Sequence, residues 1–395
     1  MPSSEATVTL NPEVSLHPLG DEAVLFLGHK GQVLLLSPSA ALMCRGLEAG
    51  LSVREIAETL ARSSGASPEA VADDLRRLTD ALREAGAMDA PAEPPGGSAA
   101  PERLPAPPPV RASGEAGPEA RHYGLVDFRF ALRTPDPAIA RLADALLGHL
   151  ERSADSGDAV LEVARIGRRW VLMRDGVALD VCTDTDQIAP LLHANIVMAA
   201  YWSSDCLAAV HGAAVTRGDD CVLMPAVSGR GKTTLTAALL ASGWGYCTDD
   251  LALLDGDPLR LRAVPTCLGL KRGSWDVLAG VFPQIEDLPV HIRADGKEVR
   301  YLAPPASVLP PPEADSYRVR AVVLPAYEQE GKTRLLGISP GEGLKRLTQA
   351  GYDLPRRLDR RSLTRLIDWI SDIPCFELRY GRLDEAVLTL PDVLP

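Results

Sequence analysis

The sequence predicts an α/β fold for the carboxy-terminal half of the chain, preceded by a small α+β unit. From residue 211 onward, β-rich apolar runs alternate with helical segments, whereas residues 10–89 contain a β-hairpin pattern followed by helices. Between these parts, proline, glycine and alanine dominate residues 90–120, a composition typical of an inter-domain linker. The chain therefore divides into a domain at residues 10–89, the linker, and a domain at residues 121–395.

The overall composition excludes several classes of protein. The 395 residues include 41 basic and 53 acidic side chains and no long lysine or arginine stripe, so we expect no nucleic-acid partner. Seven scattered cysteines without a C-x-x-C pair argue against a disulfide framework and against a structural zinc site. No apolar run reaches the ~20 residues that a membrane span needs, and residues 1–10 lack the features of a secretion signal. We expect a soluble, cytoplasmic protein with no membrane partner.

The first domain begins with a small predicted sheet. Two β-rich runs, residues 23–27 and 32–36, flank the turn sequence of residues 28–31, and residues 14–16 form a third candidate strand. This pattern predicts a hairpin or a small sheet backed by about three helices.

Two of these helices have recognisable start signals. Ser52 and Glu55 form a capping box, because the Ser52 hydroxyl can accept from the amide of Glu55 while the Glu55 carboxylate returns to the Ser52 amide. The helix that they begin extends to about residue 61. Ser67 followed by Pro68 begins a second helix. Its apolar residues fall on one face at helical spacing, namely Val71, Leu75, Leu78 and Leu82.

The second domain opens with a β-rich part at residues 121–205. We expect strands at residues 125–132, 160–166 and 170–174, with a helix at residues 137–150. An apolar helix at residues 188–202 then leads into the core of the domain, residues 206–395.

A glycine-rich loop in this core has the context of a phosphate-binding P-loop. A predicted strand at residues 221–225 precedes it and a predicted helix at residues 235–241 follows it. The loop at residues 226–233 reads AVSGRGKT, so Ala226 stands where the pattern G-x-x-x-x-G-K-[ST] has its first glycine. Alanine resists a positive φ by about 1 kcal/mol, so we expect a slightly altered loop entry and not a lost loop.

The residue types of the loop suit a nucleotide and Mg²⁺. Gly229 and Gly231 let backbone amides turn toward an anion, the helix start adds its positive dipole end, and Lys232 supplies a cation to the β- and γ-phosphates. Thr233 offers a hydroxyl to Mg²⁺. We therefore expect ATP and Mg²⁺ as cofactors, with the nucleotide bound by Ser228, Gly229, Arg230, Gly231, Lys232, Thr233 and Thr234.

Two adjacent carboxylates, Asp249 and Asp250, lie between the run at residues 244–247 and the apolar run at residues 251–254. In an α/β sheet such a position lies at the strand ends, close to the P-loop. One carboxylate can hold Mg²⁺ while the other accepts the proton of an attacking hydroxyl, and the two roles are interchangeable on the sequence alone. His211, just upstream, is a further candidate that faces the γ-phosphate.

With these residues in place, residues 211–254 resemble HPr kinase/phosphorylases and, more closely, the HPr kinase-related bacterial kinases of unassigned substrate. The likeness extends over roughly residues 122–390. It implies a P-loop kinase fold of the HPr kinase type, with Asp249, Lys232 and His211 catalytic, and with Thr233 and Asp250 at the metal. The later glycine-rich signature of true HPr kinases is not found, so HPr itself is not the expected substrate.

The first domain, on residues 28–37 and the helices that begin at Ser52 and Ser67, resembles PqqD-like domains. This resemblance implies a winged-helix-like α+β fold that binds leader peptides of ribosomally made precursors by β-augmentation. Together the two resemblances predict a kinase that phosphorylates a serine or threonine of a captured peptide. A nucleotide-dependent peptide-binding switch and a small-molecule kinase are the alternatives. The sequence is compatible with a homo-oligomer and does not determine one.

Four basic residues outside the loop are also candidates. We expect Lys271, Arg272, Lys297 and Arg300 to line the mouth of the active site and to stabilise phosphate or an acidic substrate segment.

Overall fold

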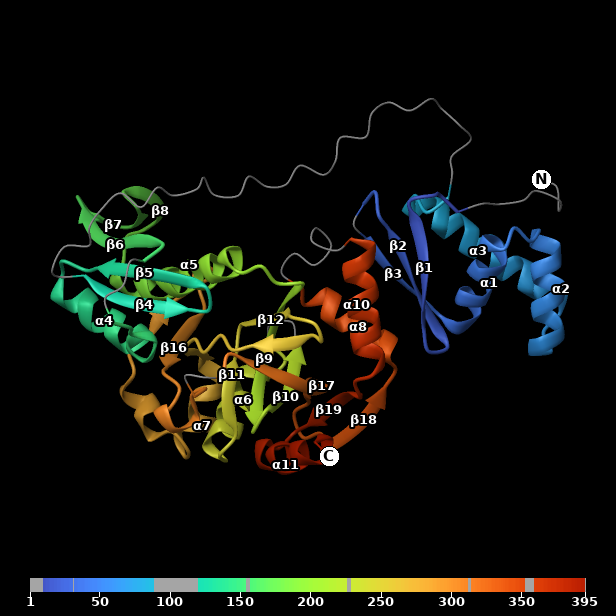
Figure 1. Ribbon diagram of the computed structural model, residues 1–395. Coiled ribbons are helices and arrows are strands. Elements are labelled where there is room, and N and C mark those ends of the chain that lie inside the picture. The colour runs from blue at the N-terminus through green and yellow to red at the C-terminus, as the bar shows by residue number, and fades with distance from the viewer. Residues whose placement is uncertain are drawn as a thin grey trace. The chain divides into compact units, whose positions relative to one another are not determined.

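The computed structural model describes residues 10–30, 32–88, 120–153, 157–225, 229–311, 314–351 and 359–394. Nearly all of the predicted linker, and the loop positions Ala226 and Ser228, lie outside these residues. Internal contacts divide the chain into two units. Figure 1 colours the chain by residue number, from blue at the amino terminus to red at the carboxy terminus. The described part of the amino-terminal unit comprises residues 10–88, 339–348 and 359–373, and the carboxy-terminal unit comprises the remainder. Two segments from late in the chain thus belong to the first unit. The predicted first domain, residues 10–89, did not include them.

The amino-terminal unit contains an antiparallel three-stranded sheet. Its strands are β1 (Val14–Leu19), β2 (Glu22–Leu27) and β3 (Gln32–Leu36), in the order β1-β2-β3. The two predicted strands of the hairpin are confirmed, and the third candidate strand is confirmed and extends to Leu19.

Three helices follow the sheet directly: α1 (Pro38–Glu48), α2 (Val53–Ser64) and α3 (Pro68–Ala85). The capping box of α2 is confirmed, because the Glu55 amide donates to the Ser52 hydroxyl at 3.3 Å and the Ser52 amide donates to the Glu55 carboxylate at 2.8 Å. Ser67 caps α3 in the same way, by accepting from the amide of Ala70. The local signals in the sequence therefore place both helix starts correctly.

Both faces of the amino-terminal sheet are buried. On one face, Ala23, Leu25 and Leu27 of β2 pack with the apolar residues of α1, α2 and α3. Val24 and Phe26 point to the opposite face, since successive strand residues alternate, and they are buried as well. Something other than the first three helices must therefore cover this second face.

The covering elements are α8 (Pro340–Gln349) and α10 (Arg360–Ser371), drawn in orange and red beside the blue strands in Figure 1. His17, Val24 and Leu35 form one cross-strand row on the second face. The Thr364 hydroxyl of α10 lies 3.5 Å from His17 Nδ1, and Ser339, just before α8, donates to the Glu22 carboxylate at 2.8 Å. Helices that follow β18 in the sequence therefore complete the fold of the first unit.

This arrangement makes a stability prediction. Leu366 of α10 is 1% exposed, so Leu366→Ala should destabilise the amino-terminal unit by about 2–5 kcal/mol through lost burial and a cavity. Hydrogen exchange should accelerate in β1 and β2. The exposed Arg361 on the same helix provides the control, because Arg361→Ala should change stability by less than about 0.5 kcal/mol. Unchanged exchange in β1 and β2 of Leu366→Ala would show that α10 does not belong to this unit.

The carboxy-terminal unit begins with a five-stranded sheet. Its strands, in spatial order, are β4 (Arg121–Leu125), β5 (Phe128–Arg133), β6 (Ala159–Ile166), β7 (Arg169–Arg174) and β8 (Val177–Cys182). The helices α4 (Pro137–Leu147) and α5 (Ile188–Ser203) contribute to the same apolar core. The predicted single strand at residues 125–132 is wrong, because the chain turns at Val126, where φ is 56°. The turn at residues 126–127 contains neither glycine nor proline, so the sequence pattern indicated one continuous strand.

The second sheet of this unit is mixed and carries the predicted loop region. Its strands are β9 (Ala208–Arg217), β10 (Asp220–Pro225), β11 (Gly245–Thr248), β12 (Leu251–Asp255), β13 (Arg260–Arg262), β17 (Ser316–Tyr327), β18 (Arg334–Ile338) and β19 (Cys375–Tyr380). The helices α6 (Lys232–Ala241) and α11 (Leu383–Thr389) pack beside it. The mixed α/β architecture is confirmed.

A smaller three-stranded sheet completes the unit. It comprises β14 (Leu268–Lys271), β16 (Glu298–Leu302) and β15 (His291–Ile292), with the short helix α7 (Trp275–Ala279) after β14. Short 3₁₀ helices occur at Gly148–Leu150, Thr185–Gln187, Arg272–Ser274, Pro283–Asp287, Ala306–Val308 and Leu390–Val393. Among the described helices of both units, none combines the length and the apolar character needed to cross a membrane.

Strand directions in the mixed sheet bring the predicted loop and the acid pair together. Both β10 and β11 run antiparallel to β9, so they point the same way and their carboxyl ends lie at the same edge. The glycine loop follows β10 and Asp249 follows β11 at that edge.

Candidate active site

The described end of the glycine loop has the backbone geometry that an anion site requires. Gly229 has a φ of 96° and Gly231 a φ of 86°, values that strain any residue with a Cβ. Helix α6 begins immediately afterwards at Lys232, so the free amides and the positive dipole end of its first turn face the same region. This combination favours phosphate binding.

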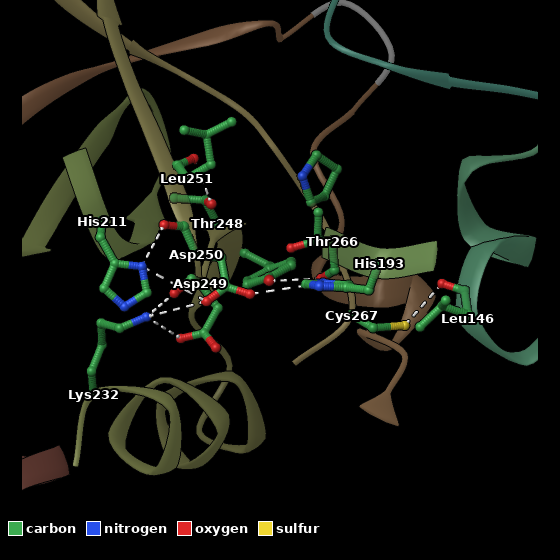
Figure 2. A network of polar contacts seen from close by, with 12 residues as sticks. Leu146, His193, His211, Lys232, Thr248, Asp249, Asp250, Leu251, Thr266 and Cys267 are labelled. Carbon is green, nitrogen blue, oxygen red and sulfur yellow. Dashed lines mark hydrogen bonds and ion pairs between the residues drawn. The ribbon is translucent and has the colours of Figure 1, made fainter. Parts of the chain in front are cut away.

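Lys232 and Asp249 form an ion pair, drawn in Figure 2, and both side chains are buried. The two side chains are 6% and 1% exposed, and Lys232 Nζ lies 3.3 Å from the Asp249 carboxylate while it also donates to the Asp249 backbone carbonyl. The Thr233 hydroxyl forms a side-chain hydrogen bond with the same carboxylate. Burial raises the pKa of Asp249 to about 6, against the opposing effect of Lys232.

Asp250 differs from its neighbour because it faces an open cavity. Its side chain is 27% exposed and lies 4.0 Å from Lys232 Nζ. Burial alone would raise the pKa of Asp250, but the positive charge of Lys232, with a contribution from Arg293, outweighs it and holds the pKa below its ordinary value. Asp250 is therefore an ionised carboxylate in contact with the cavity.

Two imidazoles flank Asp250 on opposite sides in Figure 2. His211 of β9 places Nδ1 3.1 Å from the Asp250 backbone carbonyl, and His193 of α5 places Nε2 3.7 Å from the Asp250 carboxylate. His193 also makes a hydrogen bond with the backbone of Cys267. Burial lowers the pKa of both histidines, so their neutral forms are favoured. His211 was a sequence candidate, whereas no local signal marked His193 within its apolar helix.

These groups line one cavity of about 420 Å³, a volume suited to a small ligand such as a nucleotide. Of the predicted nucleotide residues, Arg230 is exposed and is not among the described residues that line it. The lining consists of His193, His211, Gly229, Gly231, Lys232, Thr233, Thr234, Asp250, Gly269, Lys271, Gly273, Ser274, Val277, Arg293, Val299, Tyr301, Tyr327, Tyr380, Gly381 and Leu383.

The prediction of four basic residues at the mouth is right for Lys271 alone. Arg300 packs 4.2 Å from the centroid of the Trp275 ring, because alternate residues of β16 point to opposite faces and Val299 and Tyr301 take the cavity side. The side chains of Arg272 and Lys297 are 73% and 61% exposed and form ion pairs with Glu298 and Asp295.

Arg293 is the cavity cation that the sequence did not reveal. It follows β15 in a polar segment with several other charges, and nothing in the local sequence distinguishes it from them. Together with Lys271, it adds positive charge to the cavity that Asp250 also lines.

The side chains beside Lys232 fit Mg²⁺ bound together with a nucleotide. Mg²⁺ commonly takes one or two carboxylates and completes its shell with phosphate oxygens and water. The Thr233 hydroxyl and the Asp250 carboxylate line the cavity and provide oxygen ligands of this kind, whereas the Asp249 carboxylate is buried against Lys232. Within the described residues, no cluster of three or more histidine, cysteine, aspartate or glutamate side chains could hold a metal ion.

Comparison with known proteins concerns the amino-terminal unit. None of the curated proteins matches the chain. Among solved structures, TbiB1 in complex with the TbiA(beta) leader peptide matches with 22% sequence identity and a TM-score of 0.21, over 22% of this chain and 99% of that chain. Residues 7–87 match the family model PqqD, coenzyme PQQ synthesis protein D. The amino-terminal unit therefore contains a PqqD-like domain, which confirms this part of the predicted resemblance.

Proposed function

We propose that the carboxy-terminal unit is an ATP-dependent kinase of the HPr kinase type. Its substrate would be a serine or threonine hydroxyl of a ribosomally synthesised precursor peptide that the PqqD-like domain holds. The observation that carries this proposal is the ionised Asp250 carboxylate in the same cavity as the loop lysine and the glycine amides. A carboxylate in this position can accept the proton of an acceptor hydroxyl, a role that nucleotide binding alone does not require.

The donor side of the reaction rests on the loop. The amides near Gly229 and Gly231 hold the phosphates of ATP, and Lys232 compensates their charge. Mg²⁺, when bound with the nucleotide, neutralises charge that develops on the phosphate oxygens. Lys271 and Arg293 line the same cavity as Asp250 and supply further positive charge for the transferred group.

On the acceptor side, we assign the base to Asp250, and we give Asp249 the role of holding Lys232 in place beside Thr233. This moves the base away from Asp249, to which the resemblance assigned it. Asp249 is 1% exposed and committed to Lys232 and Thr233, so a substrate hydroxyl has no access to it, whereas Asp250 faces the cavity. A general base must come within hydrogen-bond reach of the proton that it accepts.

The transfer step then follows from these positions. The acceptor oxygen attacks the γ-phosphorus and its proton passes to the Asp250 carboxylate. The bond between the γ-phosphorus and the bridging oxygen breaks, and the electron pair leaves with ADP. His193 lies 3.7 Å from the Asp250 carboxylate and His211 contacts the Asp250 backbone carbonyl, so the two imidazoles limit the positions that this residue can take. The protein thus acts by positioning and by electrostatic stabilisation, as phosphoryl transfer requires.

The peptide side is assigned to the sheet of the first unit. Within the described residues, β3 pairs with β2 alone, so its other edge presents backbone groups to which an extended peptide can add as a further strand. The PqqD match supports this assignment.

The test combines peptide binding with mass spectrometry. A fluorescent precursor-like peptide is first selected by its anisotropy on the full chain, and β3 amides should become protected from hydrogen exchange when it binds. Incubation with ATP and Mg²⁺ should then add the mass of one phosphate to a serine or threonine. Binding of both ligands without a mass gain would favour the nucleotide-dependent switch, and transfer to a small metabolite alone would favour a small-molecule kinase.

A further inference from the structure

The cavity has a second end, formed by two tyrosines, that the transfer chemistry does not use. Tyr327 ends β17 and Tyr380 ends β19, and the two residues are partners in the parallel strand register. Both line the cavity, and both lie against Gly231. A Cβ added to Gly231 would lie 2.5 Å from the Tyr380 hydroxyl and 3.3 Å from Cβ of Tyr327.

The two tyrosine rings differ in how far they are exposed. Tyr380 is 2% exposed, and its hydroxyl donates to the Gly231 carbonyl at 3.3 Å. Tyr327 is 53% exposed and meets Tyr380 edge-on, with ring centroids 5.8 Å apart and an interplanar angle of 64°. A fixed tyrosine thus supports a second ring that remains accessible from the cavity.

The charges of the cavity lie away from this aromatic end. The Asp250 carboxylate lies 4.0 Å from Lys232 Nζ and 3.7 Å from His193 Nε2, and the His193 ring packs against Tyr301 of β16. Tyr380, in contrast, meets the Tyr327 ring and the Gly231 carbonyl. The cavity therefore has a charged end at Asp250 and an aromatic end at Tyr327.

This difference between the two ends orients a bound nucleotide. If the transferred phosphate lies at Asp250, the remaining phosphates pass the glycine loop, and the nucleoside leaves the loop on the Gly231 side. We propose that the exposed face of Tyr327 stacks against the nucleotide base, with Leu383 as an apolar neighbour. The inference rests on the proposed kinase function and adds a base subsite to it.

The residue types at this end also set the expected selectivity. This end offers the aromatic and aliphatic surface of Tyr327, Tyr380, Gly381 and Leu383. Asp250 is the one carboxylate among the described lining residues, which include no side-chain amide, and it lies at the charged end. Stacking tolerates any purine. We expect the affinities for ATP and GTP to differ by less than about tenfold.

Titration calorimetry on the full chain tests the subsite with two probes, the non-hydrolysable analogue AMPPNP and inorganic tripolyphosphate. Tyr327→Ala should weaken AMPPNP by about tenfold or more and leave tripolyphosphate unchanged, while Tyr327→Phe should bind both like the wild type. AMPPNP affinity unchanged in Tyr327→Ala, or an equal loss for both probes, would overturn the stacking role.

The same probes separate this inference from the proposed function. A wild-type chain that binds neither probe would contradict both. A wild-type chain that binds the two probes equally well would leave a phosphate site without a base subsite, and would overturn this inference alone.

Discussion

Lys232→Ala should abolish phosphoryl transfer and weaken ATP binding by about 100-fold, because a buried, desolvated cation facing phosphate contributes several kcal/mol. Lys232 Nζ is held by the Asp249 carbonyl and carboxylate, so the ammonium is already positioned before a ligand arrives. Preorganisation of this kind makes the charge effective in the transition state. Turnover by mass spectrometry and ATP affinity by calorimetry measure the two effects.

The single variant also removes the partner of a buried carboxylate. Asp249 is 1% exposed, and the loss of one member of such a pair destabilises a protein by about 3–5 kcal/mol while raising the pKa of the remaining acid further. A double variant, Lys232→Met with Asp249→Asn, removes both charges at similar volume and serves as the folding control. If this double variant melts like the wild type and still binds ATP with wild-type affinity, the loop is not the phosphate site.

Much of the local structure follows from local signals in the sequence. The capping box at Ser52, the Ser67-Pro68 start and the helix that follows the glycine loop each depend on residues within a few positions of one another. Such patterns specify the backbone whatever the tertiary context. The order of strand, loop and helix around Lys232 is local in the same sense and could be predicted. The position of Asp249 and Asp250 near Lys232 could be predicted as well, because the strand ends of such a sheet meet at one edge.

The features that escaped prediction depend on contacts between distant segments. His193 lies in an apolar helix and becomes part of the site because α5 brings it within 3.7 Å of Asp250. The cover of α8 and α10 over the first sheet joins residues more than 300 positions apart, such as Ser339 and Glu22. No periodicity or cap encodes such a pairing. Arg300 illustrates the remaining difficulty, since the register of β16 decides which of its side chains reach the cavity.

The second large effect concerns the two adjacent carboxylates. Asp250→Asn should reduce the transfer rate by about 10²- to 10⁴-fold, because asparagine keeps the shape of the side chain and cannot accept the hydroxyl proton. ATP binding should change little, since Lys232 and the loop amides remain. Asp249→Asn should act differently. It removes charge next to Thr233, so the Mg²⁺-dependent part of ATP binding should weaken while binding without Mg²⁺ changes less.

The measurement is calorimetry of ATP with and without Mg²⁺ for both variants, beside turnover with a peptide that the full chain binds. A large loss of turnover with intact affinity in Asp250→Asn, and a Mg²⁺-dependent loss of affinity in Asp249→Asn, would agree with the positions of the two side chains. The opposite pattern would return the base to Asp249, which then has to leave its buried contacts with Lys232 and Thr233 during turnover. Intact turnover in both variants would contradict a carboxylate base altogether, because these are the two acids that the strand ends bring to Lys232.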